Sequence, residues 1–287
     1  TWDIASQWLN VVPARQWPVT APYLPLLTGN LQSKGLANHV GSDLTFKASW
    51  LNQETWQGHL VSKAWPWQFD EGQKLDAEWQ NINRSLQGIG LVQSHNGNVS
   101  FNGTPQRYNL NLNTRTTTAK TPEGLWQITG QGSKQQFNFA NLDYLGIAGH
   151  LQADGQLSWP QGLSWQANVK LDDFKTASWL ANWPAQLTGK TQSAGVWRTN
   201  QHQLNFSQTA LQGQLKSLPL QLSGDLQLDL TNAGQLPYFQ AHQLMIDWDK
   251  NHLGVEGGFN KTWDLTVDNQ LNDLAAIDSR LKGQLSE

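Results

Sequence analysis

The stretch "SLPLQLSGDLQLDL", from Ser217 to Leu230, alternates between apolar and polar residues over most of its length. Successive side chains of a β-strand point to opposite faces, so this pattern produces a ribbon with one apolar and one polar side. The apolar side collects the leucines at every second position: Leu218, Leu220, Leu222, Leu226, Leu228 and Leu230. The stretch therefore predicts a strand that buries or shields one face only.

The same alternation recurs throughout the chain. Antiparallel sheets with one solvated face have this pattern, whereas strands of buried parallel sheets have continuous apolar runs. We therefore predict an all-β fold. The clearest further examples are "DLTFKASW" (Asp43–Trp50), "LSWQANVKL" (Leu163–Leu171), "LMIDW" (Leu244–Trp248) and "TWDLTV" (Thr262–Val267).

Composition excludes several classes of function. The 287 residues contain no cysteine, which rules out disulfides, thiolate nucleophiles and cysteine-based zinc sites. Charged residues make up only 14%, the net charge is −3, and the 19 Lys and Arg are scattered rather than clustered, which argues against nucleic acid as a partner. The 16 Trp are unusual and call for a structural role, because Trp combines a large apolar ring with one polar N–H.

A nine-residue motif with two glycines six positions apart occurs three times. The copies are "LTGNLQSKG" (Leu27–Gly35), "IAGHLQADG" (Ile147–Gly155) and "LTGKTQSAG" (Leu187–Gly195), and "LKGQLSE" at the end of the chain is a partial fourth. The uneven spacing excludes a regular propeller and favours meander units of one elongated sheet. A motif that breaks off at the last residue also predicts that the chain is part of a longer protein.

Each repeat should therefore begin a new sheet module. Short helical patterns precede three of the copies, at "YLPLL" (Tyr23–Leu27), "DFKTASWLANWP" (Asp173–Pro184) and "NDLAAIDSRLKG" (Asn272–Gly283). We predict an elongated, curled antiparallel sheet that forms an open-barrel-like groove, with short helices between modules. Residues 1–145 and 146–287 are predicted to be two β-repeat segments of the same sheet, without separate globular domains.

No catalytic motif is present, and we predict that the chain is not an enzyme and has neither a cofactor nor a metal site. The seven histidines are not spaced as metal ligands. The glycines of "GIG" (Gly88–Gly90) and "GQG" (Gly130–Gly132) have no following helix and are interpreted as bulges or close approaches, not phosphate loops. The adjacent Asp172 and Asp173 are interpreted as the N-terminal cap of the short helix that follows them.

Two interpretations of the apolar face remain open. It forms the filled core of a sandwich or barrel, or it lines a trough that stays open. Wide Trp side chains among the inward candidates, and the scarcity of elements able to cover them, favour an open trough that binds an extended apolar molecule.

The order of motifs in residues 146–287 resembles the TamB family of the AsmA-like superfamily. The resemblance lies in "WQANVKLDDFKTASWLANWPAQLTGKTQSAGVW", "HQLNFSQTALQGQLKSLPLQLSGDLQL" and "HLGVEGGFNKTWDLTVDNQLNDLAAIDSRLKGQLSE". It implies a taco-shaped sheet with an apolar interior, in a periplasmic segment of a protein anchored in the inner membrane. It also implies roles in phospholipid transport and outer-membrane protein assembly, with an outer-membrane barrel partner, TamA, that binds a region outside this chain.

Three functions follow as hypotheses. The first is a groove for phospholipid, and the alternatives are a chaperone that offers strand edges to outer-membrane proteins and a carbohydrate-binding β-sandwich with Trp65–Trp67 as platform. The residues predicted to line the lipid groove are Leu44, Phe46, Trp50, Leu163, Trp165, Val169, Leu228, Leu244, Ile246, Trp248, Trp263 and Leu265.

Overall fold

The computed structural model divides into two compact units, Thr1–Ile147 and Ala148–Glu287. It describes residues 2–11, 26–36, 39–49, 53–63, 72–86, 90–118, 121–178, 181–182, 184–199, 201–230, 238–260, 262–273 and 285–286. That the segments 1–145 and 146–287 continue one sheet without separate domains stays a prediction.

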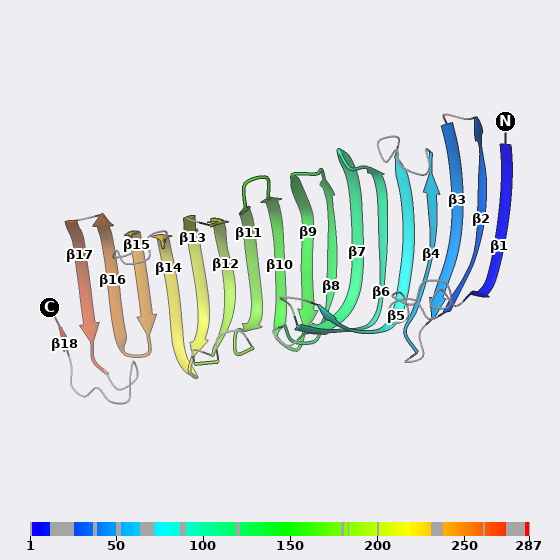
Figure 1. Ribbon diagram of the computed structural model, residues 1–287. Helices are drawn as coiled ribbons and strands as arrows, with labels where there is room; N and C mark the ends of the chain where they lie inside the picture. The colour runs from blue at the N-terminus through cyan, green and yellow to red at the C-terminus, as the bar shows by residue number, and fades with distance from the viewer. Residues whose placement is uncertain are drawn as a thin grey trace. The chain divides into compact units, whose positions relative to one another are not determined.

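The first unit consists of nine strands that pair with their sequence neighbours in antiparallel fashion (Figure 1). The strands are β1 (Trp2–Val11), β2 (Leu26–Leu36), β3 (His39–Ser49), β4 (Thr55–Ser62), β5 (Gln73–Leu86), β6 (Gly90–Thr104), β7 (Arg107–Thr118), β8 (Gly124–Gly132) and β9 (Gln136–Gly146).

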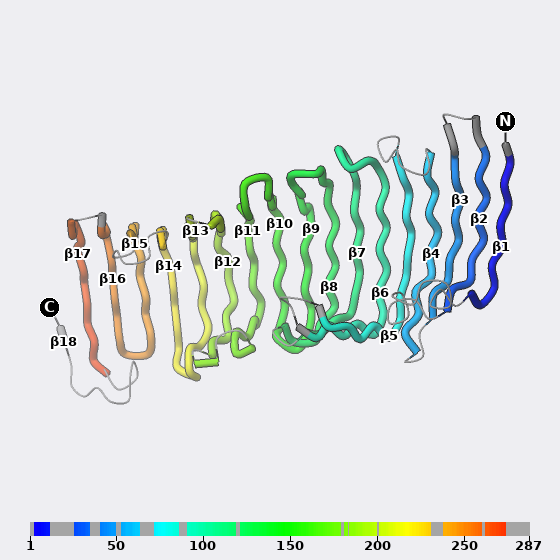
Figure 2. Tube along the Cα trace, in the orientation of Figure 1, coloured from blue at the N-terminus to red at the C-terminus, as the bar shows by residue number. Residues whose placement is uncertain are grey.

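The second unit repeats this meander, as the up-and-down course of its chain shows in Figure 2. Its strands are β10 (Gly149–Ser158), β11 (Leu163–Lys175), β12 (Ala185–Arg198), β13 (Gln201–Leu215), β14 (Leu218–Asp229), β15 (Tyr238–Trp248), β16 (Asn251–Asn260), β17 (Thr262–Leu271) and β18 (Leu285–Ser286).

The prediction of an all-β fold with an open, curled antiparallel sheet is confirmed, and the prediction of short helices needs correction. The described part of the chain contains no helix. Phe174 and Lys175, expected in a helix, extend β11 and pair with Leu187 and Gln186, and turns follow at residues 177–178 and 181–182. A helix of about 12 residues is marginal alone, so strand pairing outweighs its local propensity. Of the expected helix Tyr23–Leu27, Leu26 and Leu27 belong to β2. The other residues of that helix, 23–25, and residues 274–283 of the third expected helix lie outside the described ranges.

Register aligns the apolar positions of neighbouring strands. In the first unit one row crosses β2 to β7, and it consists of Leu31, Leu44, Leu60, Leu75, Phe101 and Leu110. The polar positions form equally regular rows on the other face, such as Asn30, Thr45, His59, Asp76, Ser100 and Asn111. A slip of one residue would exchange the faces, so the alternation itself specifies the register.

Three strands of the second unit contain a one-residue β-bulge. Asp173, Gln208 and Gln243 have φ angles of 51°, 50° and 46°, and the register shifts at each of them. The three positions are a constant 35 residues apart, on β11, β13 and β15. Bulges bend a strand and increase its twist, so this spacing bends β11, β13 and β15, which alternate with β12 and β14.

A side-chain oxygen on the following strand accepts the N–H of each bulged residue. Thr188 Oγ1 accepts from Asp173 at 3.0 Å, and carboxylates accept from Gln208 and Gln243 at 2.7 Å; these belong to Asp225 and Glu256. Asp173 is therefore a bulge residue of β11 and not a helix cap, which corrects the expectation for Asp172–Asp173. An orphaned N–H is thus bonded where the regular ladder is interrupted.

A buried carboxylate fixes the start of β4 in the first unit. Glu54 is fully buried, and its Oε1 accepts the backbone N–H of Asn83 at 2.7 Å. Its Oε2 lies 2.6 Å from an Arg84 guanidinium nitrogen. Pairing of β4 with β5 ends at Thr55 and Gln80, so Glu54 bonds the part of β5 that extends beyond β4. A buried charge is tolerated only when it is paired in this way.

Candidate functional site

In the first unit, the predicted lining residues Leu44 and Phe46 lie on the apolar face of β3. Leu44 pairs with Leu31 and Leu60, and Phe46 pairs with Gly29 and Gly58. Both side chains are half-buried, whereas the residues that alternate with them, Asp43, Thr45 and Lys47, are exposed. Trp50, predicted to line the groove, and the Trp65–Trp67 platform lie outside the described residues.

In the second unit, the other predicted residues share one face. One row runs across eight strands through Leu157, Trp165, Gly195, Leu204, Leu228, Phe239, Phe259 and Trp263. On the same face lie Leu163, Val169, Leu244, Ile246, Trp248 and Leu265, which occupy positions of the same parity once the bulges are counted. The structure thus brings together the described residues that alternation selected in this unit, and whether they line a groove stays a prediction.

This face is covered unevenly. Ala241 and Trp248 are buried, yet Leu163 is 45% and Trp263 is 64% exposed. Trp263 packs against Phe259, with ring centroids 4.7 Å apart, and against Phe239 at 6.0 Å. A filled core would bury residues of this size, so the exposed rings point to a face that is not fully covered by the described part of its own unit.

Two indole N–H groups on this face are bonded within the sheet. Trp165 Nε1 donates to Ser193 Oγ at 3.1 Å, and Trp248 Nε1 donates to the Leu215 carbonyl at 3.1 Å. In the first unit Trp79 Nε1 donates to Ser94 Oγ at 2.8 Å. These bonds leave ring carbons as the surface that the indoles present. The serine partners could not be predicted from the local pattern, because they lie 28 and 15 residues from their Trp and only the strand register brings them together.

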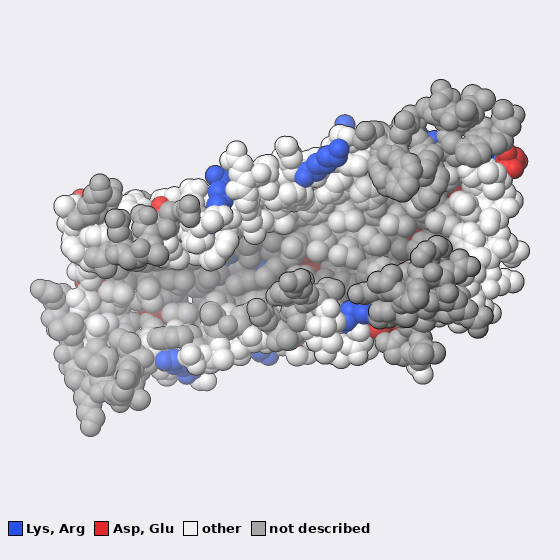
Figure 3. Space-filling model, in the orientation of Figure 1, with Lys and Arg blue, Asp and Glu red and all other residues white. Residues whose placement is uncertain are grey.

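Figure 3 shows a hollowed side with few charged atoms, most of which lie along its borders. Charged side chains of the sheet belong to the polar face, as Lys47, Asp76 and Lys170 do. The side in view is therefore the apolar face, and in each unit it is the hollowed one. The curl gathers the apolar side chains toward one another, which explains why they are half-buried without a second layer in the described residues.

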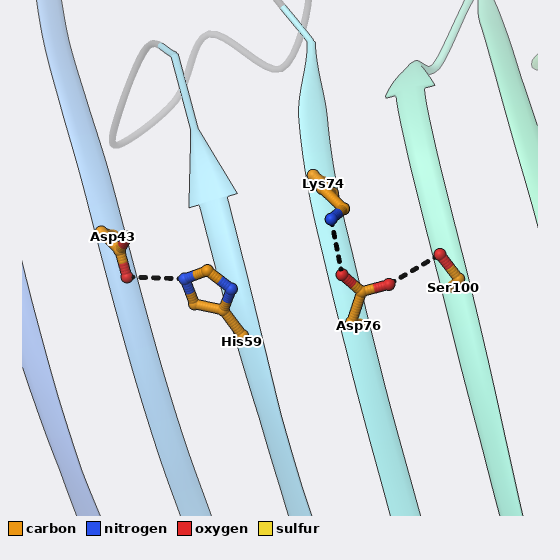
Figure 4. A network of polar contacts seen from close by, with 5 residues as sticks. All are labelled: Asp43, His59, Lys74, Asp76 and Ser100. Carbon is orange, nitrogen blue, oxygen red and sulfur yellow. Dashed lines mark hydrogen bonds and ion pairs between the residues drawn. The ribbon is translucent and has the colours of Figure 1, made fainter.

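On the polar face of the first unit, side chains form hydrogen bonds and ion pairs with one another (Figure 4). His59 Nε2 lies 2.8 Å from Asp43 Oδ1, and Asp76 accepts from Ser100 at 2.7 Å and faces Lys74 at 3.1 Å. The hydroxyl of Ser100, followed by Lys74, holds the pKa of Asp76 below its ordinary value. A shallow pocket of about 570 Å³ includes His59, Asp76 and Ser100. His59 and Asp76 are paired with the neighbouring Asp43 and Lys74, as on an ordinary solvated face.

A second such pair lies on β15 and β16. His242 Nδ1 is 2.8 Å from Glu256 Oε1, while Oε2 accepts the Gln243 N–H of the bulge. Glu256 raises the pKa of His242 above 6.5, and the bond from Gln243, followed by His242, lowers the pKa of Glu256 below 4.5.

These shifts predict a pH window for the pair. The contribution of His242 is complete below about pH 6.5 and is lost as the pH rises through the raised pKa, whereas that of Glu256 is complete above about 4.5 and is lost as the pH falls through the lowered pKa. The pair should therefore be strongest between these two values. An NMR titration of the His242 ring should give a midpoint above 6.5 that returns toward 6.5 in Glu256→Gln. An unchanged midpoint in that variant would exclude the pairing.

No group of three or more His, Asp or Glu side chains is placed to hold a metal ion within the described residues. Over those residues, no helix is both long and apolar enough for a membrane span. The apolar face therefore remains the candidate site.

Comparison with protein families gives a match over most of the chain. The model of a family described as "TamB, N-terminal domain" matches residues 16–287. The chain belongs to the TamB family. A TamB relative from Haemophilus influenzae, a translocation and assembly module subunit, is 23% identical over 164 residues, which cover 57% of this chain. The matched region is only 12% of that TamB protein's length. No solved structure matches.

Proposed function

We propose that the apolar face of each unit shields phospholipid acyl chains, as part of an envelope-spanning protein of the translocation and assembly module. The observation that carries the proposal is the continuous apolar row of the second unit, from Leu157 on β10 to Trp263 on β17. It lies on a hollowed face, and the indole N–H groups of Trp165 and Trp248 on that face are bonded to the protein rather than exposed.

Such a face needs no specific contact to hold lipid. Burial of one methylene contributes about 0.8 kcal/mol, so a 16-carbon chain gains on the order of 12 kcal/mol when it leaves water. A row of apolar side chains repeated on every strand offers similar contacts at each step. An acyl chain would therefore move along the row against small differences in free energy, which is what transport requires.

The family supports two further proposals. The chain would act in the periplasm, within a protein anchored in the inner membrane, and a region outside this chain would bind an outer-membrane barrel partner similar to TamA. Assistance to outer-membrane protein assembly is the alternative role, because the name of the relative joins translocation with assembly.

Photocrosslinking in cells grown with labelled phospholipid tests the proposal. A photoreactive residue replaces Trp165 or Val169 on the apolar face and, as matched controls on the same strand, Gln166 or Lys170 on the polar face. We expect lipid label at the apolar pair only, because the two pairs differ in face and not in strand.

The other outcomes are equally informative. Protein adducts without lipid at Trp165 and Val169 would support the assembly role instead. Label on both faces would contradict the proposal, because the apolar face would then not be selected. Absence of adducts at all four positions would also contradict it and would favour a covered core.

A further inference from the structure

In the first unit, an aromatic ring lies over a glycine in each of four consecutive strand pairs. The aromatic residue belongs to the odd-numbered strand, and the glycine lies directly opposite on the next strand. The pairs are Trp8 with Gly29, Phe46 with Gly58, Trp79 with Gly97, and Tyr108 with Gly132. All are on the apolar face, so one arrangement repeats from β1 to β8.

Close contact explains why glycine stands opposite each ring. A Cβ atom at Gly97 would lie 2.3 Å from Trp79 Cζ2, and one at Gly132 would lie 2.2 Å from Tyr108 Cζ. The corresponding distances are 2.7 Å at Gly29 and 2.8 Å at Gly58. Carbon atoms in contact are normally about 3.5–4.0 Å apart. The rings occupy the volume that any other side chain at these positions would fill.

The backbone of these glycines imposes no such requirement. None of the four has a φ angle in the left-handed region. The φ angle therefore permits alanine at each position. A Cβ at Gly29 or Gly58 would also lie 2.6 or 2.9 Å from a backbone carbonyl oxygen, of Thr45 or Asp76. At Gly97 and Gly132 the three nearest atoms all belong to the facing aromatic side chain, so alanine there conflicts first with the ring. The aromatic side chain, and not the turn of the chain, selects glycine here.

Two contacts hold the Trp79 ring on its glycine. Its Nε1 donates to Ser94 Oγ at 2.8 Å, and its ring stacks on Trp56 with centroids 5.4 Å apart. The ring therefore lies along the sheet instead of standing out from it. In the second unit Trp165 repeats the arrangement, since a Cβ at Gly195 would lie 2.3 Å from its ring and Ser193 accepts its N–H at 3.1 Å.

We propose that these glycines set the clearance of the hollow, and that the clearance determines how many acyl chains it admits. The inference rests on the proposed function. With the rings seated, the hollow of the first unit accommodates both chains of a diacyl phospholipid. A ring displaced from its glycine stands in the hollow and leaves room for a single chain, because a well-packed wall cannot absorb an added methyl group without moving the ring.

The test compares Gly97→Ala, Trp79→Ala and the double variant in the protein as its gene encodes it. Gly41→Ala is the matched control, because a Cβ at Gly41 would lie 3.7 Å from its nearest neighbour, an ordinary contact. The probes are a diacyl phospholipid and a lysophospholipid with the same head group and the same photoreactive chain, each presented in phosphatidylcholine vesicles. The measured quantity is the ratio of diacyl to lysophospholipid label.

We expect Gly97→Ala to lower this ratio by about tenfold. A factor of ten corresponds to about 1.4 kcal/mol, which is within the usual free-energy cost of adding a methyl group to a packed site. The double variant should restore the ratio, because Trp79→Ala removes the displaced ring. Gly41→Ala should leave it unchanged. Gly132→Ala, alone and with Tyr108→Ala, repeats the test at a second pair if Gly97→Ala folds poorly.

The results separate this inference from the proposed function. If the unaltered protein takes up neither probe, the proposed function fails. If it takes up both and Gly97→Ala keeps the same ratio, the role of the glycines is excluded while the lipid face stands. If the ratio falls equally in Gly97→Ala and in the double variant, the glycine acts on the fold and not through the ring, which also overturns the inference.

Discussion

Replacement of Tyr144 by alanine should lower the free energy of unfolding of the first unit by about 3–5 kcal/mol, the usual effect of removing a buried aromatic ring. Tyr144 on β9 is fully buried, and its ring packs against Trp126 with centroids 4.8 Å apart. It also lies over Gly124, where a Cβ would be 2.1 Å from the ring. Alanine would leave a cavity that the surrounding backbone cannot fill. Urea unfolding followed by Trp fluorescence measures the change.

Two controls separate the ring from its hydroxyl and from its position in the chain. Tyr144→Phe keeps the ring and removes the hydroxyl, which donates to the Glu123 carbonyl at 3.1 Å, so a loss of about 1 kcal/mol is expected. The adjacent Leu145 is 56% exposed, and Leu145→Ala should change stability by less than about 0.5 kcal/mol. If Tyr144→Ala and Leu145→Ala had equal effects, the ring would not be a core element.

The alternation of residues made the faces of the sheet predictable. Trp165, Leu228 and Trp263 are far apart in the sequence, yet they lie in one row because each strand has a period of two and neighbours pair in register. The family was also identified from the order of such strands, and the match over residues 16–287 confirms it.

Other features depend on contacts that a local pattern does not contain. The bulge at Gln208 depends on an acceptor, Asp225, on the next strand, and nothing adjacent to Gln208 in the sequence marks it. Glu54 was missed for the same reason, since its partners Asn83 and Arg84 are about thirty residues away. The helix expected after Asp173 was wrong because the bulge lets β11 continue, so that Phe174 pairs with Leu187.

Replacement of Val169 by aspartate should abolish lipid labelling while leaving the sheet folded, if the proposed function is correct. Val169 lies on the apolar face of β11 between Ala153 and Thr191 and is only half-buried. In the empty protein a carboxylate at this position keeps water around it, so folding tolerates the charge. An acyl chain that covers the position must remove that water, which costs several kcal/mol for an unpaired charge. The charge therefore raises the free energy of the lipid-bound protein and leaves that of the empty protein nearly unchanged.

Labelling from a photoreactive residue at Trp165, four residues away on the same face of β11, measures the effect. We expect the lipid signal to fall by at least about tenfold, since each 1.4 kcal/mol of lost affinity is a factor of ten. Lys170→Asp places the same charge on the polar face of the same strand and should leave labelling unchanged, and Val169→Thr keeps the shape of valine without the charge. If Val169→Asp were folded and labelled normally, lipid would not pass over Val169, and the apolar row of β10 to β17 would have to serve another purpose.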